Sequence, residues 1–117
     1  MAFNQPATRD TTIESTAITS VTPQVGSGVD IGQCQDYILD VNNSLNQAGN
    51  IQMSISTNGG AGFVDFGAPI ALGAASGYTL ISLLATKPLF GIIRATYTAS
   101  IAPASGTLKV TIHRKYI

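Results

Sequence analysis

The most constraining feature of the sequence is the stretch 50–66, which reads NIQMSISTNGGAGFVDF. In its first half, apolar Ile51, Met53 and Ile55 alternate with polar residues. A period of two is typical of a strand that has one buried face and one solvated face. The run NGGAG at 58–62 then supplies residues that tolerate positive φ, and a second apolar run, FVDF, returns after it. The stretch therefore predicts a β-hairpin.

The same alternation recurs along the chain, between turns rich in Gly, Pro and Asn. The last segment alternates most cleanly, with Leu108, Val110 and Ile112 expected to face inward and His113 outward. Besides the hairpin, strands are predicted at 11–21, 29–32, 37–41, 68–72, 78–85, 89–98 and 107–116.

No helical stripe of useful length accompanies these strands, so the pattern predicts an all-β fold. We expect a single antiparallel β-sandwich of about eight strands, with jelly-roll and immunoglobulin-like connectivities both open. Residues 11–117 are expected to form this domain, with a bulge near Ala17, where the alternation slips. Residues 1–10 have no periodicity and are expected to form an extended N-terminal arm, the alternative being a disordered tail.

Charge is scarce in this chain. Charged residues make up 10% of the sequence, whereas an ordinary soluble domain carries about 25%. A small domain exposes much of its surface, so a weakly charged surface follows, poorly protected against self-association. Either the protein is a neutral soluble monomer, or neighbouring subunits cover much of this surface.

The few charges are divided between the two halves of the chain. Residues 1–65 hold six acidic residues and one basic residue, and residues 66–117 hold five basic residues and no acidic one. These charges either pair within one subunit or form complementary patches that meet between copies. The net charge is zero, so no overall field would attract the chain to nucleic acid or to an anionic membrane.

The sequence also limits the compartment and the chemistry. A single cysteine, Cys34, excludes an intramolecular disulfide, and no signal peptide is recognised at the N-terminus. His113 is the only histidine, and no nucleophile or carboxylate partner is indicated near it, so we interpret it as a surface histidine. One His and one Cys cannot supply a zinc site, and the aspartates lack calcium-loop spacing. We therefore expect no catalytic residues, no metal and no cofactor.

Several motifs together resemble a known kind of protein. The strand at 37–41, the segment 51–57 with its STNGG turn, and the aromatic strand at 63–67 are similar to a recurring module of tailed-phage virion proteins. The segments 88–98 and 105–108 fit the later part of that module, so the resemblance covers roughly residues 27–115. The chain departs from the module at Asn58, where Asp is common, and at Phe63, where Trp is common.

The resemblance implies a non-enzymatic virion structural protein. The simplest version is a head decoration (cement) protein that binds the outer surface of the major capsid protein and stabilises the head. Its partners would be the major capsid protein and copies of itself, as a trimer or dimer, without nucleic acid or membrane. It would be made in the host cytoplasm and located on the capsid surface. The alternatives are a tail, neck or baseplate component, or a receptor- or glycan-binding module of a fibre or spike.

The contact residues expected of such a protein lie in the arm and in apolar loop positions. For the last four of them, ordinary core packing is the alternative. The candidates are Phe3, Asn4, Gln5, Arg9, Phe63, Phe66, Leu89 and Phe90.

Overall fold

The computed structural model describes residues 7–32, 34–81 and 90–116. Over these residues the chain forms strands and no helix, which confirms the all-β prediction. The strands are β1 (Ala7–Thr16), β2 (Gln24–Val25), β3 (Val29–Asp30), β4 (Cys34–Asn43), β5 (Gly49–Ser56), β6 (Val64–Leu72), β7 (Gly77–Ile81), β8 (Ile92–Ala99) and β9 (Leu108–Tyr116).

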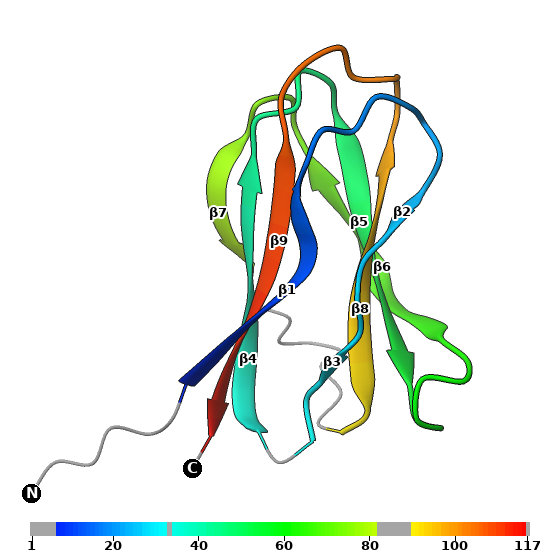
Figure 1. Cartoon of the computed structure of the whole chain (residues 1–117), viewed down its shortest axis with the longest axis vertical. Helices are drawn as coiled ribbons and strands as arrows, with labels where there is room; N and C mark the ends of the chain where they lie inside the picture. The colour runs from blue at the N-terminus through cyan, green and yellow to red at the C-terminus, as the bar shows by residue number, and fades with distance from the viewer. Residues whose placement is uncertain (1–6, 33, 82–89, 117) are drawn as a thin grey trace, which may run out of the picture.

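The strands form two antiparallel sheets that pack face to face (Figure 1). Sheet A has the strand order β1-β9-β4-β7, and sheet B has the order β2-β8-β5-β6, with β3 also paired to β8. Because β2 and β3 share one position beside β8, the sandwich has four strand positions in each sheet. The chain changes sheet at every connection between these positions except the β5–β6 hairpin. This is jelly-roll connectivity, one of the two that periodicity left open.

The inner faces of the two sheets form the core. The alternation predicted for the last segment is confirmed in β9, because Leu108, Val110 and Ile112 are fully buried. β8 alternates in the same way, with Ile93, Ala95 and Tyr97 fully buried. Burying each large apolar side chain contributes about 1.5–3 kcal/mol, so this shared inner layer is the main stabilising element of the fold. The core also includes Ile13, Ile18, Val29, Ile31, Tyr37, Leu39, Val41, Leu45, Ile51, Met53, Leu72 and Ala99.

The first strand differs from its predicted bounds. β1 begins at Ala7 and ends at Thr16, so residues 7–10 pair with β9 rather than standing apart as an arm. Its register shifts lie on either side of Ile13, not near Ala17. Thr12 explains the first shift, because it bonds across to sheet B, where its hydroxyl donates to the Ser27 carbonyl at 2.6 Å.

The predicted hairpin is confirmed, with β5 and β6 paired from Gly49↔Leu72 to Ile55↔Val64. The expected solvated face is wrong at Ser54 and Ser56, which are 4% and 1% exposed. The loop that joins the strands is ordered by local hydrogen bonds. The amide of Gly60 donates to Ser56 Oγ at 2.8 Å, and the amide of Gly62 donates to Asn58 Oδ1 at 3.1 Å.

Two other predicted segments differ in length from the observed strands. Residues 64–66 of the FVDF run and residues 68–72 belong to one continuous strand, β6, which bends at Gly67, where φ is +70°. A register shift faces this bend between Ile51 and Met53, which is typical of a β-bulge. The strand predicted at 78–85 is described as β7 up to Ile81, and its remainder lies outside the described residues.

Tyr97 carries a stability prediction. Its hydroxyl is buried without a hydrogen-bond partner among the described residues, and burial raises the pKa of the phenol above its ordinary value. An unsatisfied buried polar group destabilises the folded state by about 1–3 kcal/mol. We therefore expect Tyr97→Phe to raise the free energy of unfolding by about 1 kcal/mol. Urea denaturation at neutral pH measures the change, and a loss of stability would show that the hydroxyl is satisfied in solution.

Candidate functional site

The predicted contact residues separate into described and undescribed positions. Arg9 lies in β1, where its backbone pairs with that of His113. Phe90 precedes β8 and is 65% exposed, as a contact residue should be. The other predicted residues from the arm and the loop before Phe90 lie outside the described residues: Phe3, Asn4, Gln5 and Leu89.

Phe63 and Phe66 are more enclosed than Phe90. The guanidinium carbon of Arg94 lies 3.8 Å from the centroid of the Phe63 ring, a cation–π contact that holds the hairpin loop over the outer face of sheet B. Phe66 is partly buried and packs against the core, so the core-packing alternative holds for this residue. Of the described candidates, Phe90 is therefore the most available to a partner.

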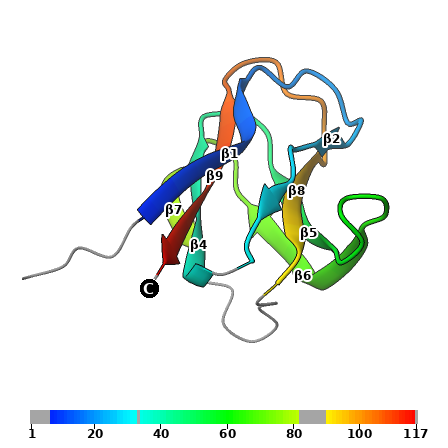
Figure 2. The same cartoon turned by 60° about the horizontal axis from the view of Figure 1, so that its bottom comes forward.

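One end of the sandwich gathers the features that the sequence associated with contacts. We call it the hairpin end: the loop 57–63 and the starts of β6 and β8, with the exposed Val64 first in β6 and the exposed Phe90 just before β8; β1 starts at the same end, on the side away from the loop (Figures 1 and 2). Val64 is 71% exposed, beside the hairpin loop. Exposed apolar residues also occur elsewhere, including Ile101 in the loop between β8 and β9 at the opposite end (Figure 1).

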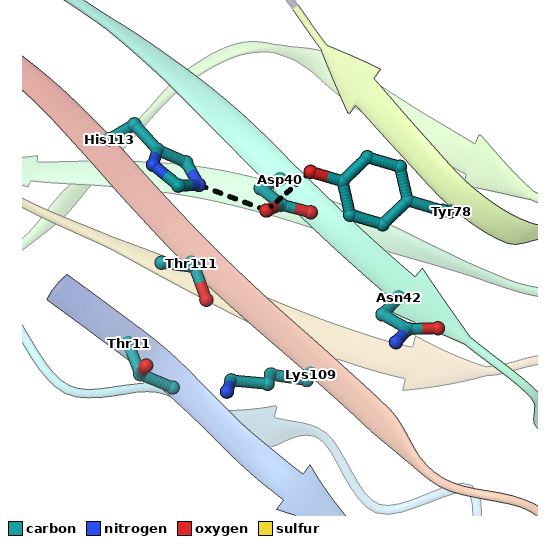
Figure 3. Close-up of a pocket in the computed structure, with 7 residues that line it drawn as sticks. All are labelled: Thr11, Asp40, Asn42, Tyr78, Lys109, Thr111 and His113. Carbon is teal, nitrogen blue, oxygen red and sulfur yellow. Dashed lines mark hydrogen bonds and ion pairs between the residues drawn. The ribbon is translucent and has the colours of Figure 1, made fainter. Parts of the chain in front are cut away.

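A polar cluster occupies the outer face of sheet A (Figure 3). The Tyr78 hydroxyl on β7 donates to Asp40 Oδ2 on β4 at 2.9 Å, and His113 Nε2 on β9 lies 2.9 Å from the same oxygen. The expectation that His113 has no carboxylate partner is therefore wrong. The physical reason is register: Asp40 pairs with Thr111, so His113 is its diagonal neighbour on the same face.

A pocket of about 190 Å³ opens beside this cluster. Thr111, which is 7% exposed, belongs to its lining, and Figure 3 shows the side chains that surround it. Hydroxyl, carboxylate, amide, ammonium and imidazole groups meet there, so the pocket offers both hydrogen-bond donors and acceptors. The lining comes from four strands of sheet A: Thr11, Asp40, Asn42, Tyr78, Lys109, Thr111 and His113.

Sequence reasoning did not find this pocket. Its residues lie in the outward phase of strands that are far apart in the chain, and Asp40 and His113 are separated by 73 positions. The outward phase was visible for β9, but only the adjacency of β4 and β9 brings the two groups together. The polar residues at the outward positions of β9, together with Asp40 and Asn42 on β4, were the available signal, and it needed the strand order to be useful.

Within 7–32, 34–81 and 90–116, no three His, Cys, Asp or Glu residues group closely enough to hold a metal ion. The same residues contain no helix that is long and apolar enough to span a membrane.

Strand order and connectivity define this chain as a small jelly-roll sandwich with a polar pocket on one outer face. No protein-family model matches the sequence, and no curated protein matches it. Among solved structures, the chain is similar to the crystal structure of the SPBc2 prophage-derived protein YomS, with a TM-score of 0.53 and 14% sequence identity. The similarity covers 98% of this chain and 97% of the other, so the two proteins share their fold from end to end.

Proposed function

We propose that this protein is a non-enzymatic structural component of a tailed-phage virion that binds the outer surface of the head as a decoration protein. The observation that carries the proposal is the hairpin end. There Phe90 and Val64 expose large apolar side chains, at 65% and 71%, on a chain with only 10% charged residues. Exposed aromatic groups on such a surface are typical anchors of protein–protein contacts.

Two further observations support a virion role. The fold is shared end to end with a protein that is described as prophage-derived. The motifs at 37–41, 51–57 and 63–67, which resemble those of virion proteins, lie in or beside β4, β5 and β6, which follow one another along the chain. The partner we propose is the major capsid protein, together with copies of this chain in a trimer or dimer. The location would be the capsid surface, after synthesis in the host cytoplasm.

A decoration protein works by multiplying a modest contact over a symmetric surface. Each copy buries a limited area, and closed symmetry with several neighbours adds the individual contributions. The hairpin end fits this task because Val64 begins β6 and Phe90 lies just before β8, so both apolar side chains are attached to the sheet or next to it and lose less conformational entropy on docking than a free loop would.

Copy number tests the proposal. In purified particles, we expect this protein to be present at hundreds of copies relative to the major capsid protein, measured by quantitative gel densitometry or mass spectrometry. Light scattering on the isolated protein would give the dimer or trimer. A few copies per particle would contradict the decoration role and favour the tail, neck or baseplate alternative, and absence from particles would contradict a virion role altogether.

A further inference from the structure

The pocket on the outer face of sheet A is a surface that the decoration proposal does not use. Its lining comes from β1, β4, β7 and β9, whereas the exposed apolar residues of the hairpin end flank strands of sheet B. A function of this pocket would therefore be separate from head binding, and each can be tested without the other.

One hydroxyl of the lining is available to a ligand. Thr111 is 7% exposed as a residue, lines the pocket, and has no hydrogen-bond partner among the described residues. Its oxygen is not among the fully buried unpaired atoms, so it remains open to the pocket. A ligand hydroxyl in the pocket could bond to it.

The neighbouring groups extend the same hydrogen-bonding capacity. Asp40 is held in place through Oδ2 by Tyr78 and His113, while its Oδ1 has no partner among the described residues. The amide of Asn42 and the ammonium of Lys109 also line the pocket. Asn42 sits opposite both Tyr78 and Lys109 in the strand register, so these groups form one row across the sheet.

The two charges in the pocket have opposite signs. Asp40 is negative and Lys109 is positive, so a simple anion or cation would be attracted by one of them and repelled by the other. A neutral ligand avoids this repulsion, since one of its hydroxyl groups can donate to Asp40 Oδ1 and another can accept from the Lys109 ammonium. A ligand with several adjacent hydroxyl groups matches this arrangement best.

The size and the rim of the pocket further restrict the class of ligand that it can bind. Its volume of about 190 Å³ is below the roughly 300–1,000 Å³ of pockets for drug-sized ligands, and it suits one small ring. Tyr78, at 65% exposure, presents its ring at the rim, and its hydroxyl bond to Asp40 fixes the ring position. The apolar C–H face of a sugar ring packs well on such an aromatic face.

We infer that this pocket binds one residue of a neutral saccharide, with Asp40, Asn42, Lys109 and Thr111 contacting its hydroxyl groups and Tyr78 packing against its ring. His113 acts as a positioning residue, because it contacts Asp40 and holds the carboxylate in place. Such a site would let a surface-bound protein hold a saccharide while the opposite sheet takes part in docking.

The test measures binding of defined sugars to the intact protein by saturation-transfer NMR. D-glucose, D-galactose and N-acetyl-D-glucosamine are the neutral probes, and glucuronate and glucosamine are the charged ones. We expect at least one neutral probe to bind with a Kd of about 1 mM, the weak affinity of a single sugar in a shallow pocket. Thr111→Val and Asp40→Asn should each weaken that binding by about tenfold or more.

A matched control separates the pocket from general surface effects. Thr96→Val makes the same chemical change on the outer face of sheet B, and its sugar binding should equal that of the unmodified protein. Thermal melting of all three variants checks that each is folded. If one of the two pocket variants misfolds, the other still tests the proposal. The proposal is overturned if no neutral probe binds up to about 10 mM, if only a charged probe binds, or if neither pocket variant weakens binding.

Discussion

Replacing Gly106 with alanine is expected to destabilise the protein by about 3 kcal/mol or more, enough to unfold much of it at moderate temperature. Gly106 has a φ of +94°, which L side chains rarely adopt. A methyl group there would also overlap the Ser44 carbonyl and lie 2.7 Å from the Leu45 Cα. The strained φ and the overlap with Ser44 and Leu45 both involve backbone atoms, which cannot move aside as the end of a side chain can.

The surrounding loop explains why this clash cannot relax. The amide of Thr107 donates to Ser44 Oγ at 2.9 Å, and the amide of Ser44 donates to the Thr107 carbonyl at 2.9 Å. Leu45 is fully buried, so a shift of this loop would open the core. The loop at Ser44 and the loop at Thr107 are therefore joined by hydrogen bonds at the residues that would have to move apart to accommodate the methyl group.

Two other glycines serve as controls for the two components of this effect. Gly59 has a φ of +76° with no atom within 4 Å of an added methyl group, so Gly59→Ala should cost about 1 kcal/mol, from the backbone alone. Gly73 has neither constraint, and Gly73→Ala should be nearly neutral. Urea denaturation of the three variants measures the series, and equal losses at Gly106 and Gly59 would show that the loop does relax.

The sequence predicts the fold class well because the alternation of apolar and polar residues within one strand indicates which of its side chains are buried. Each of β5, β8 and β9 carries apolar residues at alternate positions, and these residues lie in the buried core, except Ile55, which is partly buried and packs against it. The hairpin turn is equally local, since Asn58 and the following glycines determine it through bonds within five residues. These features depend on no information about distant strands.

Strand order and the polar pocket depend on pairing between strands that are far apart in the sequence. The alternation within a strand does not indicate which strands pair. Ser54 and Ser56 look like solvated residues in sequence, yet the hairpin loop and Arg94 on β8 cover this face of sheet B. Similarly, Asp40 and His113 meet only because the jelly-roll order sets β4 beside β9. The residues involved have the expected outward phase, but their neighbours are chosen by the global topology.

Phe90→Asp is expected to weaken the proposed binding to the phage head by about 30-fold or more while leaving the fold intact. Aromatic residues at the centre of an interface commonly contribute 2 kcal/mol or more, which corresponds to about this factor. Phe90 is 65% exposed, so a charged side chain there remains solvated in the free protein. In a docked complex the same carboxylate would be buried against an apolar contact without a partner, which is unfavourable. Val64→Asp, at 71% exposure on the same end, should act in the same direction.

The matched control for this prediction is Ile101→Asp, which introduces the same charge at a residue of similar exposure, 62%, on the opposite end of the sandwich. Binding is measured by adding each purified variant to heads assembled without the protein and quantifying the bound fraction after sedimentation. Thermal melting should give the same midpoint for all variants, since none of these side chains is in the core.

If Ile101→Asp releases the protein and Phe90→Asp does not, the opposite end docks and the role of the hairpin end is wrong. If binding depends on Phe90 alone, the hairpin end acts through a single aromatic anchor, whereas equal losses from Phe90→Asp and Val64→Asp would indicate that the whole end is buried on the head.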